Sequence, residues 1–343
     1  MNFLGLKGKD IGIDLGTANT LVILKGKNIV LKEPSVVAID KKTGDVIATG
    51  YEAKEMLGRT PADIEAIKPL QDGVIADFTA TQLMLKNIVS KVCQRYNAGR
   101  PRVVIGVPSG ITEVEERAVE ESVIRAGAKE VFIIEEPMAA AIGAGLDVAE
   151  PTGNIIVDIG GGTTEVAVIS LGGIVVSNSL RTAGDELDED IVNYVKREFG
   201  ILIGRTTAEE IKKQIGCAMP LMTELSMEIK GRDLQTGYPR SVNITSSQVL
   251  EAMENSIAEI IDVIKITLEK TPPELAADIV ERGVVLTGGS ALIRNLDKLI
   301  SQKIKMPVYI AEEPAECVVR GTGKTLLDIE KLKDVLVNSR KRR

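Results

Sequence analysis

Two short segments of the chain place an acidic side chain just before a turn rich in glycine and threonine. The first reads IGIDLGTANT and contains Asp14, and the second reads VDIGGGTTEV and contains Asp158. Glycine-rich turns offer backbone N–H groups to phosphate oxygens, and threonine hydroxyls add further donors. Carboxylates beside such turns can hold Mg²⁺, mostly through its waters. The repeated pattern therefore predicts two turns that clamp the phosphates of a nucleotide, with Asp14 and Asp158 as the carboxylates of a magnesium site.

Each pattern by itself is also typical of an ordinary hairpin that uses glycine for its turn. A third segment, GVVLTGGSALI, favours the nucleotide interpretation. It predicts a buried strand, a Gly-Gly turn and a following helix, an arrangement that places backbone N–H groups where phosphates or nucleosides bind. The three segments in this order indicate a nucleotide site much more strongly than any one of them alone.

The composition narrows the chemistry that the chain can perform. The 343 residues include no histidine, so catalysis would depend on carboxylates, hydroxyls, lysines or a bound cation. The formal net charge of −7 and the 3% of aromatic residues argue against nucleic acid as a partner. The 3 cysteines have no CxxC spacing, which is typical of a cytosolic protein with reduced thiols.

The hydrophobic pattern predicts a mixed sheet covered by helices, followed by a second copy of the same layout. The N-terminal part is expected to be a run of strands, followed by a helix over residues 80–96 and another that begins at a Thr112 cap. A short alanine-rich helix should follow Pro137. Beyond it, three strands joined by glycine turns repeat the N-terminal layout, and a helix should end at Gly200. A chain of this length is expected to form two lobes.

The segments DLGTANT, EEPMAAAIGAG, VDIGGGTTEVAVISLGG and LTGGSALI resemble the nucleotide site of the actin, Hsp70 and sugar-kinase superfamily. Within it the chain is very similar to the MreB family of bacterial actins, from Lys9 to about Asp328. The resemblance implies an α/β, actin-like ATPase fold with two duplicated ribonuclease-H-like lobes, a nucleotide cleft between them and four subdomains. It also implies that ATP with Mg²⁺ is hydrolysed slowly and that hydrolysis regulates assembly into membrane-associated filaments. Such filaments organise cell-wall synthesis and maintain rod cell shape.

The same resemblance divides the chain into subdomains. Lobe I would comprise residues 1–145 and 316–343, with a small subdomain IB at about 33–78 beside subdomain IA. Lobe II would comprise residues 146–315. Within lobe II, subdomain IIA is expected at about 146–180 and 242–315, and subdomain IIB at about 181–241.

The resemblance also assigns roles to single residues. Glu136 and Thr163 correspond to the catalytic pair that orients the attacking water, and Asp14 and Asp158 to the metal-site carboxylates. A carboxylate is also the common general base that remains in a chain without histidine. Glu135 is the competing candidate; we favour Glu136, because alternation along a strand would point only one of the two into the cleft. The implied nucleotide-binding residues are Gly16, Thr17, Ala18, Asn19, Gly160, Gly161, Gly162, Thr163, Glu209, Lys212, Gly288, Gly289 and Ser290.

Some of these positions have a simpler interpretation. Glu209 and Lys212 lie three residues apart on an expected helix and could form a surface ion pair, whereas the resemblance implies that they reach the ribose hydroxyls. Asn19 stands where eukaryotic actin and Hsp70 place a basic residue near the phosphates, so Mg²⁺, backbone dipoles and hydroxyls would meet the phosphate charge. Three methionines near the middle of the chain are expected to be core rather than interface residues, namely Met219, Met222 and Met227.

The implied partners are further copies of the chain, the cytoplasmic face of the membrane and cell-wall elongation proteins. No window approaches the roughly 20 apolar residues of a membrane span, and the N-terminus does not resemble a signal peptide. The expected location is therefore cytoplasmic and peripheral at the inner face of the cell membrane. Candidate membrane contacts are Met1–Leu6, the turn over residues 95–101 and, more weakly, the basic tail over 338–343. Met1–Leu6 is favoured as the lead-in to a strand packed on the core, and the tail as a solvated terminus. The turn carries one aromatic residue, Tyr96, and should be a poor anchor.

Two alternatives share the predicted nucleotide site. A soluble ATPase related to the sugar kinases would need a second pocket with a catalytic aspartate for the acceptor hydroxyl. An Hsp70-like ATPase would need a β-rich peptide-binding domain after the nucleotide domain. The sequence suggests neither feature, so the filament interpretation is preferred.

Overall fold

The computed structural model describes residues 9–327, 329, 336 and 337, and the contacts within it divide the chain into two compact units. Unit 1 is built from the described parts of Met1–Thr152, Ile169–Val175 and Glu316–Arg343. Unit 2 is built from Gly153–Val168 and Val176–Ala315. The predicted membrane contacts at Met1–Leu6 and over 338–343 lie outside the described residues.

The main sheet of unit 1 has the strand order β19-β10-β9-β1-β2-β3. β1 and β2 form an antiparallel hairpin, while β1 runs parallel to β9, and β9 runs parallel to β10. The prediction of a mixed sheet is therefore confirmed. Its strands are β1 (Ile11–Leu15), β2 (Asn19–Leu24), β3 (Ile29–Pro34), β9 (Arg102–Val107), β10 (Glu130–Glu135) and β19 (Leu336–Val337).

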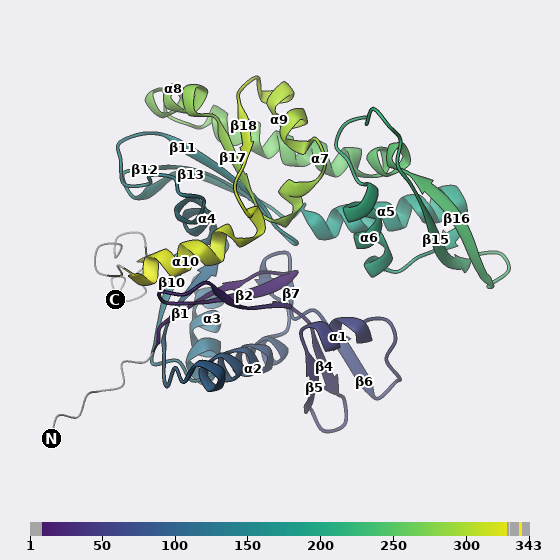
Figure 1. Cartoon of the computed structure of the whole chain (residues 1–343), viewed down its shortest axis with the longest axis horizontal. Coiled ribbons are helices and arrows are strands. Elements are labelled where there is room, and N and C mark those ends of the chain that lie inside the picture. Colours follow the sequence, from purple (N-terminus) through teal and green to yellow (C-terminus); the bar gives the residue numbers. More distant parts are fainter. Residues whose placement is uncertain (1–8, 328, 330–335, 338–343) are drawn as a thin grey trace. The chain divides into compact units, whose positions relative to one another are not determined.

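The two faces of β1 bury different kinds of residue. Ile11 and Ile13 are fully buried in a core shared with helices α2 (Phe78–Tyr96) and α3 (Glu113–Arg125). Gly12 points to the other face, where a β-carbon would lie 2.3 Å from Oγ1 of Thr322 in α10 (Cys317–Leu327). Figure 1 shows α10 on the side of these strands opposite α2 and α3. Because side chains alternate along a strand, Asp14 shares the glycine face of β1 with Gly12.

Helix α3 begins where the sequence predicts. The hydroxyl of Thr112 accepts a hydrogen bond from the backbone N–H of Glu115, and the Glu115 side chain accepts one from the backbone N–H of Thr112. This reciprocal capping box satisfies two donors that a helix otherwise leaves free at its start. The Thr112 cap is therefore confirmed.

The remaining elements of unit 1 are short. One small sheet has the order β5-β4-β6, and β7 and β8 form a hairpin. The strands are β4 (Val37–Asp40), β5 (Val46–Thr49), β6 (Ile64–Ile67), β7 (Leu70–Gln71) and β8 (Val74–Ile75). The helices are α1 (Tyr51–Met56) and α4 (Glu136–Ala144), and α4 confirms the helix expected after Pro137.

The main sheet of unit 2 repeats the layout of unit 1. Its order is β13-β12-β11-β17-β18, in which β11 runs parallel to β17, and β17 runs parallel to β18. The series β3-β2-β1-β9-β10 in unit 1 has the same order, which confirms the predicted second copy. The strands are β11 (Asn154–Ile159), β12 (Thr164–Ser170), β13 (Gly173–Leu180), β17 (Val284–Thr287) and β18 (Val308–Ile310).

Unit 2 adds a three-stranded sheet in the order β14-β15-β16 and several helices. The strands are β14 (Ile201–Leu202), β15 (Ser226–Asp233) and β16 (Pro239–Thr245). The helices are α5 (Gly184–Phe199), α6 (Arg205–Ile215), α7 (Ser246–Glu269), α8 (Pro273–Arg282), η1 (Gly289–Leu292), α9 (Leu296–Ile304) and η2 (Pro314–Glu316). Helix α5 ends at Gly200, whose φ of 64° suits glycine, as predicted.

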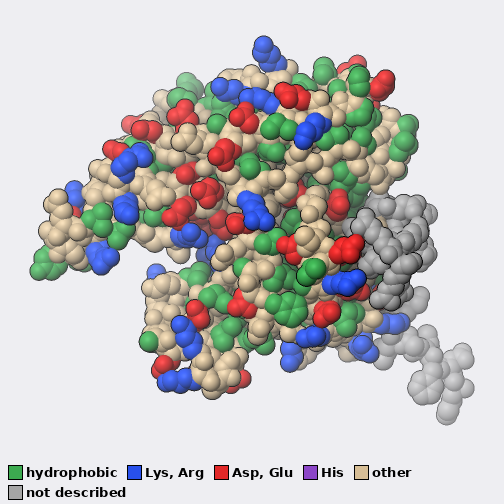
Figure 2. Space-filling view, turned by 180° about the vertical axis from the view of Figure 1, so that it is seen from behind, with side chains coloured by type: hydrophobic (Ala, Val, Ile, Leu, Met, Phe, Trp, Pro, Cys, Tyr) green, Lys and Arg blue, Asp and Glu red, His purple; other side chains and the backbone are tan. Residues whose placement is uncertain are grey.

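The exposure of individual side chains tests the predictions for the three methionines and for the turn over residues 95–101. Met227 packs partly buried against the core of unit 2, but Met222 is fully exposed, so its assignment to the core was wrong. In the turn over 95–101, Tyr96 is half-buried beneath Lys27 and Arg95. Figure 2 shows basic and acidic side chains interspersed on the face that it presents. None of the described helices is both long and apolar enough to cross a bilayer.

Candidate nucleotide-binding site

In unit 1 the first glycine-rich turn is tied closely to its surroundings. A β-carbon on Gly16 would lie 2.8 Å from the carbonyl oxygen of Asn19, so glycine allows the tight turn between β1 and β2. The Ser35 hydroxyl donates a 2.6 Å hydrogen bond to the Gly16 carbonyl. Thr17 is buried, and its Oγ1 accepts a 3.2 Å hydrogen bond from the backbone N–H of Gly73. Asn19 is exposed and Ala18 is half-buried, so the turn keeps polar groups at the surface of unit 1.

Glu136 lies on the same face of the sheet of unit 1 as Asp14. In the parallel register, Asp14 of β1 is aligned with Gly106 of β9. A β-carbon on Gly106 would lie 3.4 Å from Cγ of Glu136, so the Glu136 side chain packs over the position beside Asp14. The structure thus brings the predicted metal carboxylate and the predicted base of unit 1 together.

The local structure of Glu136 differs from the prediction. Strand β10 ends at Glu135, and Glu136 is the first residue of α4, followed by Pro137. The expectation that both Glu135 and Glu136 lie on a strand was therefore wrong. Pro137 fits the first turn of a helix, because its missing N–H is not needed there, and the helix N-terminus favours a negative charge at Glu136.

The two neighbouring carboxylates have different environments. Glu136 is 8% exposed. Glu135 is half-buried and accepts a 3.3 Å hydrogen bond from the Ser109 hydroxyl. Burial raises the pKa of Glu135, and the hydrogen bond from Ser109 opposes this rise. Alternation along a strand cannot choose between them, because only Glu135 belongs to the strand.

In unit 2, Asp158 is a buried carboxylate with too few hydrogen-bond partners among the described residues to offset its burial. It lies on β11 opposite Thr287 of β17 and is 6% exposed. Its Oδ1 atom has no hydrogen-bond partner among the described residues. Burial raises the pKa of Asp158 to about 6, and the hydrogen bond from Thr287 opposes this only in part. A buried anionic oxygen without a partner is the kind of group that a bound cation would neutralise.

The donor set fits Mg²⁺ better than a cation that needs a cage of protein ligands. Among the described residues no group of three or more Asp, Glu, Cys or His side chains is close enough to hold a metal ion. Mg²⁺ usually binds one or two carboxylates and completes its shell with waters and phosphate oxygens.

We expect the variant Asp158→Asn to stabilise the ligand-free protein at pH 7. The raised pKa means that ionised Asp158 disfavours folding, so the isosteric amide should increase the free energy of unfolding by about 2 kcal/mol. Because the folded protein holds a proton on Asp158 below its pKa of about 6, the difference between the native chain and the variant should shrink as the pH falls through 6. Urea unfolding at pH 5 and pH 7.5 measures it. An unchanged or decreased stability at pH 7.5 would contradict the prediction.

The second glycine-rich turn is joined to the start of α5 and to Ser290. The carbonyl of Gly160 accepts hydrogen bonds from the Ser290 hydroxyl at 2.8 Å and from the backbone N–H of Gly184 at 3.2 Å. The carbonyl of Gly161 accepts one from the backbone N–H of Asp185 at 2.7 Å. A β-carbon on Gly184 would lie 2.7 Å from the Ser290 hydroxyl, so glycine is needed at this junction. Gly162 and Thr163 complete the turn and are buried.

Lys212 reaches the same junction from α6. Its Nζ donates to the carbonyl of Gly184 and lies 2.8 Å from Oδ1 of Asp188. Glu209 instead pairs with Lys213, so the surface ion pair between Glu209 and Lys212 is not formed. Burial raises the pKa of Asp188 to about 6, Lys212 opposes the rise, and the charge of Glu209 adds to it. Lys212 therefore places a buried positive charge beside the second turn.

The third glycine segment packs directly on the strand that carries Asp158. Gly288 has a φ of 84°, and a β-carbon there would lie 2.2 Å from the carbonyl oxygen of Ile159. Gly289 is exposed and has open space around it. The element that follows is the single 3₁₀ turn η1, and α9 begins only at Leu296. A helix therefore follows the Gly-Gly turn as predicted, but its first turn is of the 3₁₀ type.

Each unit thus gathers its own share of the predicted site residues. Unit 1 holds Asp14, the first turn and Glu136, and unit 2 holds Asp158, the second turn, Lys212 and the segment from Gly288 to Ser290. Sequence reasoning missed Gly73, Gly184 and Asp188. A glycine at the start of an expected helix was the available signal for Gly184, but the contact between Asp188 and Lys212 joins two helices and has no local signal.

Comparison with known proteins identifies the family of this chain. The profile of the MreB/Mbl protein family matches residues 8–334. The cell shape-determining protein MreB of Escherichia coli K12 is 54% identical over 329 residues, which cover 94% of this chain and 95% of the relative. The cell shape-determining protein Mbl of Bacillus subtilis 168 is 51% identical over 324 residues, which cover 94% of this chain and 97% of the relative.

Solved structures show the same fold. MreB5 of Spiroplasma citri bound to ADP superposes with a TM-score of 0.90 at 42% identity and covers 94% of this chain and 98% of its own. A MamK double helical filament has a TM-score of 0.78 at 25% identity and covers 92% and 98%. The duplicated sheets and these neighbours define an actin-like α/β protein. The chain belongs to the MreB/Mbl family.

Proposed function

We propose that this chain is an actin-like ATPase that binds ATP with Mg²⁺ and assembles into filaments which maintain rod cell shape. The observation that carries the proposal is the repeated glycine-rich turn beside Asp14 and Asp158, each at the same place in one of two sheets with the same strand order. The structures of MreB5 bound to ADP and to AMPPNP, and the MamK filament, support nucleotide binding and self-assembly. The names of the curated relatives support the role in cell shape.

The proposed chemistry uses residues of this chain. The turns around Gly16 and Gly160 would bind phosphates through backbone N–H groups, and Lys212 and the Gly288–Ser290 segment would lie toward the nucleoside. Bound Mg²⁺ would neutralise phosphate charge. Glu136 would accept a proton from the attacking water, which Thr163 would help to orient. With no cation in the first turn, turnover would be slow.

We further propose that units 1 and 2 correspond to the two lobes of the fold, each with a large and a small subdomain. Nucleotide would bias the chain toward a form that polymerises, and hydrolysis or phosphate release would loosen the subunits. The filaments would lie at the inner face of the membrane and recruit cell-wall elongation proteins.

Sedimentation with parallel measurement of phosphate release tests this function. The purified chain should pellet in ATP–Mg²⁺ more than in ADP–Mg²⁺, and anionic vesicles should increase the pelleted fraction. The variant Asp158→Asn should remain folded but lose most of the response to ATP–Mg²⁺. Asp190→Asn is the matched control, because Asp190 is a partly buried carboxylate of unit 2 that accepts a 2.6 Å hydrogen bond from the Ser256 hydroxyl. ATP turnover without assembly under any condition would favour a soluble kinase-like or Hsp70-like ATPase instead.

A further inference from the structure

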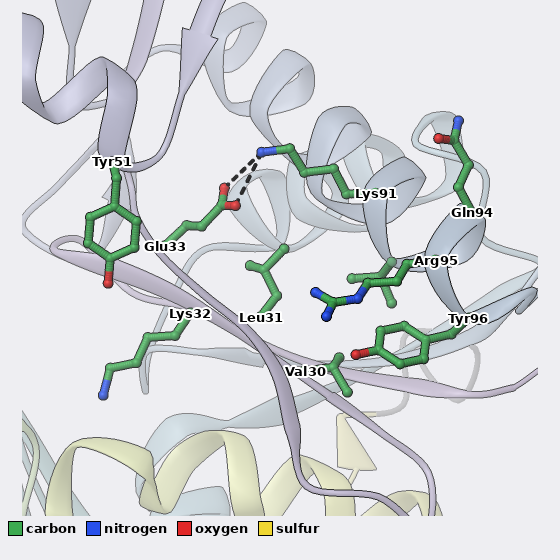
Figure 3. Close-up of a pocket in the computed structure, with 10 residues that line it drawn as sticks. Val30, Leu31, Lys32, Glu33, Tyr51, Lys91, Gln94, Arg95 and Tyr96 are labelled. Carbon is green, nitrogen blue, oxygen red and sulfur yellow. Dashed lines mark hydrogen bonds and ion pairs between the residues drawn. The ribbon is translucent and has the colours of Figure 1, made fainter.

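Unit 1 contains a groove that the proposed nucleotide site does not use. The groove has a volume of about 660 Å³ and lies between residues 30–33 of β3, the C-terminal part of α2 and Tyr51. Figure 3 shows Lys91 and Arg95 projecting from α2 toward β3, with Tyr51 on the opposite side. All of these residues belong to unit 1, so the groove is complete within one compact unit.

One wall of the groove is the edge of a sheet. β3 is the last strand in the order β19-β10-β9-β1-β2-β3, and no described strand pairs with its outer side. Such an edge presents backbone N–H and C=O groups that can pair with an extended chain. The register of β2 and β3 shifts near Val30, and Pro34 has no N–H, so the regular free edge extends over residues 31–33. An added strand would therefore be short and would depend on side-chain contacts for much of its affinity.

The charges that line the groove favour an anionic ligand. Three cations and one carboxylate line it, in a chain whose formal net charge is −7. Glu33 is paired with Lys91, whose Nζ lies 3.2 Å from each carboxylate oxygen. Arg95 stacks 5.5 Å from the ring centre of Tyr96 and forms no ion pair with any described residue. Lys32 is about half exposed but already pairs with Glu316 at 3.5 Å. Because side chains alternate along a strand, Lys32 points to the opposite face of β3 from Leu31 and Glu33, which face α2. Arg95 is thus the cation best placed to receive an incoming carboxylate.

The same groove offers apolar contact. Val30 and Leu31 are half-buried and pack against the core of unit 1. Tyr51 is 61% exposed on the opposite side. An exposed tyrosine beside half-buried aliphatic side chains is typical of protein-binding surfaces. Alternating apolar and acidic residues in an extended peptide would match this combination, because successive side chains of a strand point to opposite sides.

We propose that this groove binds an extended acidic peptide segment of another protein, which adds as a short strand to the edge of β3 and pairs a carboxylate with Arg95. The basic ends of this chain, MNFLGLKGK and SRKRR, carry the wrong charge to occupy the groove. An anionic lipid surface would match the cations but would leave the backbone groups of the strand edge without partners, so the peptide is favoured. The inference does not depend on nucleotide binding.

Fluorescence anisotropy with a capped, labelled octapeptide of alternating Val and Glu tests the proposal. The full chain should bind it, and the counterpart with Lys in place of Glu should bind at least tenfold more weakly. The variant Arg95→Glu should also weaken binding at least tenfold. Lys86→Glu is the matched control, because Lys86 is an exposed cation of the same helix α2 that does not line the groove, and this variant should change binding less than twofold.

Backbone pairing has its own test. N-methylation of every second amide on one edge of the peptide should abolish binding, whereas methylation of the alternate set should leave it nearly unchanged. Equal binding of both methylated peptides would overturn strand addition. Equal binding of the Glu and Lys peptides would overturn the charge assignment. If the peptide fails to bind, but phosphatidylglycerol vesicles bind the native chain and not the Arg95→Glu variant, the groove contacts lipid and the peptide proposal is wrong.

Discussion

Replacing Glu136 with Gln should slow phosphate release by about a hundredfold or more while ATP-dependent sedimentation persists. The amide keeps the shape of the side chain but cannot accept a proton, and a positioned general base typically contributes about 10²- to 10⁴-fold to a rate. Glu136 lies on the face of the sheet that carries Asp14, and it begins helix α4. Assembly should survive, because binding of ATP rather than its cleavage is proposed to favour the polymerising form.

Glu135→Gln provides the matched control for this experiment. Glu135 is adjacent in sequence and equally acidic, but it caps α4 as the last residue of β10 and accepts its hydrogen bond from Ser109. We expect its phosphate release to fall less than threefold in single-turnover assays with saturating ATP. If Glu135→Gln is inactive and Glu136→Gln is not, the roles of the two carboxylates are reversed. If both retain full turnover, the base lies elsewhere.

Replacing Gly143 with Ala should lower the free energy of unfolding by about 3 kcal/mol, because it would force α4 and α10 apart. A β-carbon on Gly143 would lie 1.8 Å from the carbonyl oxygen of Cys317, and one on Gly321 would lie 1.8 Å from the carbonyl oxygen of Ala139. Overpacking of this kind typically costs about 1–3 kcal/mol and sometimes more. Alanine is more favourable than glycine in an isolated helix by about 1 kcal/mol. A decrease in the free energy of unfolding can therefore come only from the packing of α4 against α10. Urea unfolding followed by circular dichroism measures the change.

Gly145→Ala separates close packing from backbone conformation. Gly145 ends the same helix with a φ of 85°, and no atom lies within 4 Å of its ideal β-carbon. The left-handed backbone alone should cost about 1 kcal/mol. If Gly143→Ala and Gly145→Ala lower the free energy of unfolding by the same amount, the close packing of α4 on α10 does not account for the effect of Gly143→Ala. Because α4 begins at Glu136, we also expect Gly143→Ala to slow phosphate release.

The features that could be predicted from the sequence have local causes. The apolar runs around Asp14 and Asp158 form the strands expected of them, because each run is short and ends at glycine. The Thr112 cap and the Gly200 end of α5 follow from hydrogen bonding and backbone conformation within a few residues. The duplication was visible because the same local pattern occurs twice.

The features that could not be predicted depend on contacts between distant segments. Lys212 contacts Asp188 and Gly184 because α6 packs beside α5. The spacing of Glu209 and Lys212 along one helix does not predict this contact between two helices. The helix after the Gly-Gly turn that follows β17 begins as a 3₁₀ turn before α9, although the same residues would also permit an α-helical turn. Met222 is exposed because its loop bypasses the core of unit 2, which hydrophobicity alone does not reveal.

The crossing of α4 and α10 has a consequence for how the newly made chain folds. Unit 2 is inserted between the parts of unit 1, so α10 is synthesised about 170 residues after α4. At typical synthesis rates of about 5–20 residues per second, roughly 10 to 35 seconds separate the two helices on the ribosome. During that interval the alanine- and glycine-rich surface of α4 has no α10 to cover it, whereas nearly all of unit 2 is already available. Unit 2 should therefore reach its native state first, and the nascent unit 1 should be the part that a chaperone protects.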